Sequence, residues 1–394
     1  MNSALDGIRV LDLTQVMAGP YCSMLLCDMG ADVIKIEPPR GDSTRRMPGA
    51  VGTDSPSFNA VNRGKRGVVI DLKLQAGLET FRRLVVDADV MVENYRPGVL
   101  DRLGLGYKEL ATLNKGLIYT SISGYGSTGP ASGKGGFDLV AQGVSGLMSV
   151  TGEAGRPPAK VGVPITDLGA ALFAVTGILS ALLARIKTGR GQLVDTSLVD
   201  AGVALSVWEA TQLFSGRGVP EPLGSAHRMN APYQAMRCAD GYITVGAAND
   251  RTFRRLCAAL GHPEWADCQD YRDDEHRVRH RDELTLRIEE ILERRSRSHW
   301  LGLLAASEVP CGPINDYAEV MADPHIQARE LVVETVHPTL GRIKTLGTPV
   351  KLSETPLIPG RPAPRLGEHT DEVLGEAGFN TDDIAALRET GAVA

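Results

Sequence analysis

The sequence has few of the residues that mark metal-binding or disulfide-stapled proteins. Its 394 residues include six cysteines, which form no Cys-x-x-Cys pair and no Cys/His spacing typical of a zinc site. Scattered thiols in a chain of this length indicate a reducing compartment, so we expect a cytoplasmic protein without a bound metal. The stretch MNSALDGIRVLDLTQ at the N-terminus has no basic region followed by an apolar one. We therefore expect no secretory signal.

Excess positive charge and long apolar runs are also scarce. The formal net charge is −6 and the pI is near 5.8, so we expect no nucleic-acid partner. One uncharged run, Leu168–Ala184, just reaches the lower length limit for crossing a bilayer. It contains Gly169 and Ser180 and is bounded by Asp167 and Arg185. We therefore predict a buried core helix and no membrane partner.

What the sequence has is an alternation of short β-branched runs with longer helical patterns. This alternation predicts an α/β fold with a parallel sheet and helical crossovers, in which ligands bind beyond the carboxyl ends of the strands. Helical patterns occur at Tyr21–Met29 and Gly77–Asp87. The predicted strands are Ile8–Thr14, Ala31–Glu37, Gly67–Lys73, Asp89–Tyr95 and Leu117–Ser123.

Composition changes along the chain predict two domains, and 43% hydrophobic content can fill two cores. We assign residues 1–200 to a large domain and 201–225, which are rich in Gly and Pro, to a linker. Residues 226–315 form a smaller and more charged α/β domain. Residues 316–394 form a further linker and a C-terminal segment that returns to the large domain with little core of its own.

A glycine-rich stretch, Gly124–Gly129, spells G-x-G-x-x-G directly after a predicted strand. A dinucleotide site needs a helix to begin at the third glycine, so that its N-terminus receives the pyrophosphate. Here Pro130 and the sequence ASGKGG follow, and they do not propagate a helix. Lys134 is not followed by Ser or Thr, which excludes a P-loop. We expect neither a nicotinamide nor a nucleoside triphosphate, and assign the loop to other chemistry.

Asp167, in the stretch VGVPITDLGAALFAV, lies where a long apolar helix is predicted to begin. At the N-cap position its carboxylate would face free backbone N–H groups and the positive end of the helix dipole, which favours ionisation. Many helices begin with an aspartate that only caps them. The residue pattern alone is compatible with either a reactive carboxylate or an ordinary cap.

Four segments together resemble the class III CoA-transferases, a family that also contains the α-methylacyl-CoA racemases. The resemblance runs from about Leu5 into the C-terminal tail. It implies a Rossmann-like large domain, a smaller α/β domain and an interlocked homodimer, with Asp167 as the catalytic carboxylate. The segments are GIRVLDLTQVMAGPYCSMLLCDMGADVIKIEPPRGDSTR, DVMVENYRPGVLDRLGLGY, ISGYGSTGP and TDLGAALFAVTGILSALLARIKTGRGQLVDTSL.

The resemblance implies transfer of CoA from an acyl-CoA to a free carboxylic acid, through an aspartyl anhydride and an aspartyl-CoA thioester. CoA is then a co-substrate and no other cofactor is needed. Backbone N–H groups of the glycine-rich loop suit the oxyanions of such a reaction, so we expect the loop to face Asp167. The segments GSAHRMNAPYQA and VPCGPIND most resemble the succinyl-CoA-dependent branch. Its acceptors include glutarate, hydroxymethylglutarate, malate and itaconate.

The family pattern also assigns binding residues. A flap corresponding to Val245–Asp250 is expected in the small domain, with Ala247 and Ala248 at positions where more glycines are expected. Arg40 is a further candidate, although the family's basic residue falls two places earlier, where this chain has Pro38. The residues expected to bind the acceptor acid are Arg45, Arg46, His227, Arg228, Asn230 and Gly246. Those expected to flank CoA are Met17, Ala18, Arg40, Ile70, Asp71, Leu72, Lys73, Asn94, Tyr95, Arg96, Arg102, Gly135, Gly136, Phe137 and Asp138.

Two alternatives remain at this point. The racemase relatives carry a G-H-D triplet whose histidine moves a proton, whereas this chain has Gly136-Phe137-Asp138. Because phenylalanine cannot carry a proton, the triplet disfavours an epimerase. The other alternative is an inactive CoA-binding scaffold, which the presence of Asp167 and of the glycine-rich segments disfavours.

Overall fold

The computed structural model describes residues 3–357 and 361–394. The chain divides into two compact units, of which the larger contains Met1–Leu147, Lys160–Ser215 and Pro324–Ala394. The smaller contains Met148–Ala159 and Gly216–Asp323. The chain thus passes between the units four times. The boundaries inferred from composition differ from this division, since 201–215 lie in the larger unit and 148–159 and 316–323 in the smaller.

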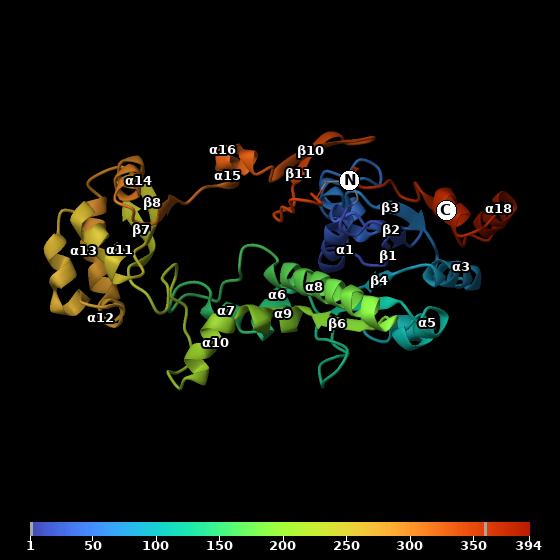
Figure 1. The fold of residues 1–394 in the computed structure, drawn as a ribbon, viewed down its shortest axis with the longest axis horizontal. Coiled ribbons are helices and arrows are strands. Elements are labelled where there is room, and N and C mark those ends of the chain that lie inside the picture. Colours follow the sequence, from blue (N-terminus) through green and yellow to red (C-terminus); the bar gives the residue numbers. More distant parts are fainter. Residues whose placement is uncertain (1–2, 358–360) are drawn as a thin grey trace. The chain divides into compact units, whose positions relative to one another are not determined.

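The larger unit is built on a six-stranded sheet in which every neighbouring pair is parallel. The strand order is β3-β2-β1-β4-β5-β6, the order of doubly wound dinucleotide-binding folds. The α/β class and the parallel sheet are confirmed, and each of the five strand patterns contains or overlaps a strand (Figure 1). The strands are β1 Arg9–Asp12, β2 Asp32–Glu37, β3 Arg66–Val69, β4 Val90–Glu93, β5 Ile118–Ser123 and β6 Leu193–Ser197.

Helices cover both faces of this sheet because alternate strand residues are apolar on both sides. One core joins Val10 and Val90 to α1 (Ala18–Asp28) and to α8 (Ile165–Thr188). The other joins Leu11 to α3 (Gln75–Val86). Burial of each large apolar side chain in these cores contributes about 1.5–3 kcal/mol. The other helices up to the smaller unit are α2 Pro56–Asn62, α4 Val99–Arg102, α5 Tyr107–Leu113, α6 Asp138–Val144, α7 Leu147–Val150, α9 Leu198–Leu205 and α10 Val207–Phe214.

The apolar helix α8 is buried on one side only, which corrects the prediction of a buried core helix. Ala170, Ala174 and Ile178 pack into the core, whereas the opposite side exposes apolar residues. Among the described residues, α8 is the one helix whose length and composition would suffice to cross a membrane. Its large exposed apolar side chains are Leu172, Phe173, Leu183 and Ile186.

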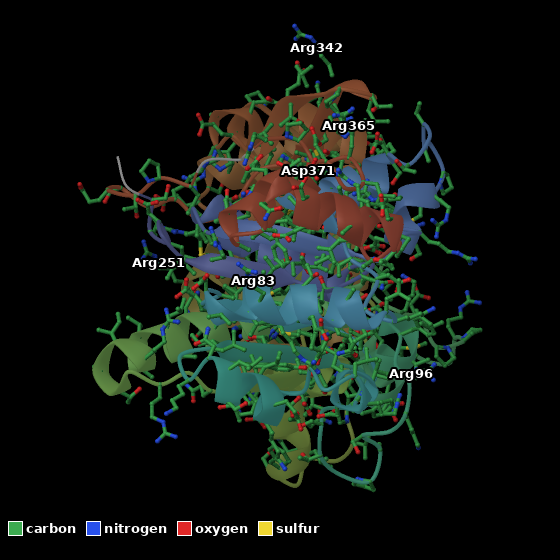
Figure 2. All side chains as sticks on the ribbon, turned by 90° about the vertical axis from the view of Figure 1, so that its right-hand side faces the viewer. Arg83, Arg96, Arg251, Arg342, Arg365 and Asp371 are labelled. Carbon is green, nitrogen blue, oxygen red and sulfur yellow. The ribbon has the colours of Figure 1, made fainter. Side chains whose placement is uncertain are left out.

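The C-terminal segment packs against the β3 edge of the sheet. It forms the hairpin β10–β11 (Val332–His337 and Gly341–Leu346) and the helices α16 (Pro324–Ala328), α17 (Thr370–Glu376) and α18 (Thr381–Glu389). Arg66 of β3 donates to Glu372 and Glu376 of α17, the helix that carries Asp371 in Figure 2. Leu374 and Ile384 also enter the core. The segment therefore contributes more to the core than the sequence indicated.

The smaller unit has an antiparallel three-stranded sheet in the order β7-β8-β9. Its helices pack on this sheet around Phe253, Ile288 and Trp300. The segments GYITVGA, RTFRRLCAAL and RDELTLRIEEILERR of this unit form β8, α11 and α13. The elements are β7 Tyr233–Cys238, β8 Gly241–Gly246, α11 Asp250–Ala259, α12 Asp274–Arg279, α13 Arg281–Leu292, α14 Arg297–Ala306, β9 Cys311–Pro313 and α15 Tyr317–Ala322.

Candidate active site

The strand order of the large sheet reverses between β1 and β4, so the loops that follow these strands diverge and leave a crevice. Asn94, directly after β4, bridges the two loops. Its Oδ1 accepts a hydrogen bond from the Gln15 backbone N–H at 2.8 Å, and its Nδ2 donates to the Gln15 carbonyl at 2.8 Å. Asn94, which the sequence predicted to flank CoA, therefore joins the loops that follow β1 and β4.

A cavity of about 370 Å³ lies at this position. Ten of the sequence-predicted site residues line it, and they come from four separate segments of the larger unit. The ten are Met17, Ala18, Asn94, Tyr95, Arg96, Gly135, Gly136, Phe137, Asp138 and Asp167. Arg96 lines the cavity and is exposed to solvent.

The glycine-rich loop forms one wall of the cavity by closing on itself. A Cβ atom on Gly124 would lie 2.7 Å from the Gly136 Cα, and one on Gly136 would lie 2.5 Å from the Gly124 Cα. Only glycine permits this backbone contact, which brings Phe137 to the end of β5. Between Gly124 and Phe137 there is no helix. The prediction that no helix begins at the third glycine, Gly129, is confirmed.

Asp167 is the third residue of α8 and does not cap it, which corrects the predicted position. The N-cap residue is Pro164, whose side chain makes no capping hydrogen bond. Instead, Asp138 reaches across from the start of α6. Its Oδ1 accepts hydrogen bonds from the Thr166 backbone N–H at 2.9 Å and from the Thr166 Oγ1 at 2.7 Å. Its Oδ2 accepts from Gln142 at 2.7 Å.

The environment of Asp167 raises its pKa to about 6, first through burial and second through the negative charge of Asp138. The sequence argument expected the helix dipole to favour ionisation, and this expectation is wrong in direction. Burial and a like charge outweigh the dipole here. The carboxyl is still mainly ionised at neutral pH. It is also more basic than an ordinary aspartate, which suits a group that must attack a carbonyl carbon.

The start of α1 lies on the same cavity. Met17 is its N-cap residue, and no side chain accepts the first-turn N–H groups of this helix. Met17 and Ala18 both line the cavity. Such uncapped amide groups are suitable donors to an oxyanion that develops on a bound substrate.

Several residues predicted to flank CoA lie outside the lining of this cavity. Ile70 is buried and forms a β-bridge with Val393, and Lys73 is exposed beyond β3. Asp71 and Leu72 stand between them and are half-buried. Arg40 and Arg102 are exposed, and the Arg40 carbonyl accepts a hydrogen bond from Arg46, which is also exposed. These positions belong to the same unit as the cavity and leave the cationic groups of Arg40, Arg46, Lys73 and Arg102 open to solvent.

Arg45 is placed differently from the prediction that it binds the acceptor. Its side chain is completely buried. It donates to both carboxylate oxygens of Glu37, at 2.6 and 2.7 Å, and lies 3.6 Å over the Phe58 ring. With its donors engaged inside the protein, Arg45 has a structural role, and we withdraw it as a substrate ligand.

The other four residues predicted to bind the acceptor acid in the smaller unit contact neighbouring residues of that same unit. The His227 ring packs on Tyr233 with centroids 5.1 Å apart. Arg228 donates to the Glu221 carbonyl at 2.8 Å, and Asn230 donates to Asp274 at 2.6 Å. Gly246 ends β8, and the side chain of the following Ala247 is buried. The predicted flap is thus a strand-to-helix connection that ends in the capping box of α11.

Residues 5–370 match a family model described as CoA-transferase family III. The chain belongs to this family. The resemblance found in the sequence is therefore confirmed, and the protein is an enzyme of CoA transfer.

Relatives of this family III enzyme match it over nearly its whole length. The human succinyl-CoA:glutarate CoA-transferase is 41% identical over 393 residues, which cover 99% of this chain and 90% of the human protein. The succinyl-CoA:mesaconate CoA-transferase of Haloarcula hispanica is 40% identical and covers 96% of this chain, with 97% of that protein matched. A crystal structure of a CAIB/BAIF family protein from Brucella suis is 38% identical with a TM-score of 0.85, covering 96% of this chain and 100% of that one.

Sequence reasoning missed several residues of the cavity. Gln15 and Val16 lie in the loop after β1 and could have been found from the rule that loops after strands bind ligands. Leu198 follows β6 in the same way. Lys134 brings an exposed cation to the lining and had been considered only in the context of a P-loop. The remaining missed residues are Pro97, Ile122 and Ser123, whereas Gly124 belongs to the glycine-rich stretch that was expected to face Asp167.

Proposed function

We propose that this enzyme transfers CoA from succinyl-CoA to a free dicarboxylic acid and that Asp167 is its covalent nucleophile. One observation carries the proposal: a partly buried carboxyl, with its pKa raised to about 6, lies in one cavity with the uncapped start of α1 and with the glycine-rich loop. A nucleophile, amide donors and a restricted space for an acyl group are what acyl transfer needs.

The reaction begins when an Asp167 carboxylate oxygen attacks the thioester carbonyl carbon. The carbon–sulfur bond breaks, the thiolate of CoA leaves, and a mixed anhydride with Asp167 remains. The thiolate then attacks the Asp167 carbonyl carbon, and the donor acid leaves as a carboxylate. These two steps conserve the energy of the thioester in an aspartyl-CoA thioester, so no nucleoside triphosphate is consumed.

The second half repeats these steps in reverse order with the acceptor. A carboxylate oxygen of the acceptor attacks the aspartyl thioester carbon and expels the thiolate. The thiolate attacks the acceptor carbonyl of the new anhydride, which forms the product acyl-CoA and restores the Asp167 carboxylate. Each tetrahedral oxyanion needs donors in place before it forms, and the Met17–Ala18 and Gly135–Gly136 backbones lie on the cavity for this role.

CoA carries a 3′-phosphate and a pyrophosphate, so its outer part needs cations outside the acyl cavity. Arg96 and Lys134 stand at the lining, while Arg40, Lys73 and Arg102 are exposed on the same unit. We assign the thioester end to the cavity and the nucleotide end to this set of exposed cations.

The choice of substrates draws on the names of the relatives, which act on succinyl-CoA with glutarate or mesaconate. All three are dicarboxylic acids or their thioesters, so the site must hold a second carboxylate. Arg46 and the smaller unit's His227, Arg228, Asn230 and Gly246 remain the candidates for this contact. Phe137 is 79% exposed at the cavity. It occupies the position of the proton-carrying histidine in racemases, which disfavours epimerisation.

We also propose that the enzyme is a homodimer. Monomeric proteins rarely expose large contiguous apolar surfaces, and the larger unit exposes apolar side chains along α8, α9 and α10. Covering them with a second copy agrees with the interlocked dimer that the family resemblance implies. The exposed residues concerned are Leu172, Phe173, Leu183, Ile186, Val203, Leu205, Val207, Leu213 and Phe214.

An acceptor screen tests the proposed function. Succinyl-CoA is incubated with the enzyme and with glutarate, hydroxymethylglutarate, malate, itaconate or mesaconate, and acyl-CoA products are separated by mass. We expect a new acyl-CoA with at least one of these acids, and none with the Asp167→Ala variant. Absence of every product while succinyl-CoA still binds would support the scaffold alternative. Conversion of an acyl-CoA to its epimer would support a racemase.

A further inference from the structure

Val16, in the turn between β1 and α1, has a backbone conformation that valine rarely adopts. Its φ angle is +70°, in the left-handed region that is unfavourable for a β-branched side chain. It lines the cavity, and its side chain is 46% exposed. Burial of the side chain therefore does not account for the strain, and the backbone must be held by its partners.

The partner of the strained residue is Asp42, a carboxylate with no exposure to solvent. The Val16 backbone N–H donates to Asp42 Oδ2 at 3.2 Å and lies 3.4 Å from Oδ1. Asp42 is itself fixed, because its Oδ1 accepts hydrogen bonds from the Thr44 backbone N–H and from the Thr44 Oγ1, both at 2.9 Å. Its own backbone N–H donates to Glu37 at 2.9 Å.

Lys35 holds the other end of the same turn. Its fully buried Nζ donates to the Thr14 carbonyl at 2.5 Å and lies 3.4 Å from Asp42 Oδ2. A buried ion pair thus binds two backbone groups of one turn, the carbonyl of Thr14 and the amide of Val16. The turn leaves little freedom for adjustment, since a Cβ atom on Gly19 would lie 2.3 Å from the Thr14 side chain.

We propose that Asp42 and Lys35 are positioning residues of the transfer reaction. They hold Val16 in its left-handed conformation, and this conformation aims the Met17–Ala18 backbone at the carbonyl group that Asp167 attacks. The inference rests on the function proposed above. It adds that the buried ion pair acts on the chemical step through Val16 and not merely on stability.

A double-mutant cycle separates the two roles. In Asp42→Asn, a donor replaces the acceptor that faces the Val16 N–H and Lys35, so the turn loses its anchor without a change of side-chain size. Val16→Gly removes the conformational preference that the anchor works against, because glycine adopts positive φ freely. If Asp42 acts through Val16, glycine at position 16 must reduce the effect of the Asp42 substitution.

We expect Asp42→Asn to lower kcat about tenfold or more in the parent enzyme, with the KM for succinyl-CoA little changed. In the Val16→Gly background the same substitution should lower kcat by only about twofold. If Asp42→Asn lowered kcat by the same factor in the parent enzyme and in Val16→Gly, the inference would be overturned and Asp42 would have a purely structural role.

A milder pair of variants keeps the test decisive if Asp42→Asn does not fold. Thr44→Val removes one hydrogen bond to Asp42, and we expect a severalfold loss of kcat that Val16→Gly reduces. Thr120→Val is the matched control, because the Thr120 hydroxyl is buried in β5 and has no hydrogen-bond partner among the residues that the structure describes. It should leave kcat unchanged. Equal losses in Thr44→Val and Thr120→Val would contradict the inference.

Amide hydrogen exchange gives a readout that does not depend on turnover. Exchange of the Val16 amide should be faster in Thr44→Val than in Thr120→Val, and equal exchange would contradict the anchoring. Failure of the proposed function looks different, since the parent enzyme would then transfer CoA to no acceptor. If the parent enzyme transfers CoA but the effects of Asp42→Asn and Val16→Gly on kcat are additive, the positioning role is overturned and the proposed function stands.

Discussion

Asp138 accepts two hydrogen bonds from Thr166, one from its backbone N–H at 2.9 Å and one from its hydroxyl at 2.7 Å. These bonds fix the first turn of α8, in which Asp167 is the next residue. The same carboxylate raises the pKa of Asp167 by charge repulsion, in addition to the larger effect of burial. One side chain therefore both orients the proposed nucleophile, Asp167, and raises its basicity.

The pKa of Asp167 predicts the pH dependence of the reaction. The nucleophile must be ionised, so kcat/KM should rise about tenfold per pH unit below pH 6 and level off above it. Steady-state rates with succinyl-CoA measured between about pH 5 and pH 8 check this. A profile that stays flat over the whole range would show that the ionisation of Asp167 does not limit the rate.

Asp138→Asn tests whether the titrating group is Asp167. Glu93 at the end of β4 also has a raised pKa, about 7, mainly because of burial, so a profile alone does not assign the group. Removing the negative charge of Asp138 should lower the pKa of Asp167 and move the midpoint of the profile to lower pH. An unmoved midpoint would assign the titration to another group, with Glu93→Gln as the variant that identifies it.

The ionised carboxylate of Asp167 should lower the free energy of unfolding at neutral pH. Its folded-state pKa of about 6 lies above the ordinary value of 3.8, so the folded state binds its proton more tightly than the unfolded state does. The stability gained from this tighter proton binding is fully present below about pH 3.8 and is lost as the pH rises through 6. Asp167→Asn should therefore raise the free energy of unfolding at pH 7 by about 1–2 kcal/mol.

Urea denaturation at pH 7.5 and pH 4.5 measures this effect. The stabilisation by Asp167→Asn should be larger at the higher pH and shrink at the lower one. A variant that is less stable than the parent at pH 7.5 would contradict the assignment of a strained, partly buried charge.

Arg45 and its neighbour Arg46 should behave in opposite ways. Arg45→Met leaves Glu37 buried without its partner, and we expect a loss of about 3–5 kcal/mol in the free energy of unfolding. Arg46→Met changes an exposed side chain and should stay within about 0.5 kcal/mol of the parent. Denaturation of both variants checks this, and equal stabilities would contradict the structural role of Arg45.

The strands β1 to β5 could be predicted because they are buried on both faces and are therefore rich in β-branched residues. The first turn of α8 was predicted less well. A cap is defined by hydrogen bonds, and the bond to the Thr166 amide comes from Asp138, 28 residues earlier in the sequence. Such a partner is visible only after folding, as is the burial that reverses the expected shift in the pKa of Asp167.

The segment GDSTRRMPG shows the same limit at single-residue scale. Arg45 and Arg46 are adjacent in a 3₁₀ turn, yet one is buried over Phe58 and the other is exposed. The sequence offers both as equivalent cations. The left-handed conformation of Val16 is likewise beyond sequence reasoning, because the preference of valine argues against it and the groups that hold the turn, Asp42 and Lys35 among them, are distant in the sequence.

The central claim is that a single carboxylate carries the acyl group during transfer, and mass spectrometry of the Asp167 peptide tests it most directly. The enzyme is incubated with succinyl-CoA and no acceptor, then treated with hydroxylamine or borohydride to trap an activated carboxyl, and digested. We predict a modification on Asp167 that is absent without succinyl-CoA and absent in Asp167→Ala. An unmodified Asp167 in an enzyme preparation that transfers CoA once an acceptor is added would contradict the account.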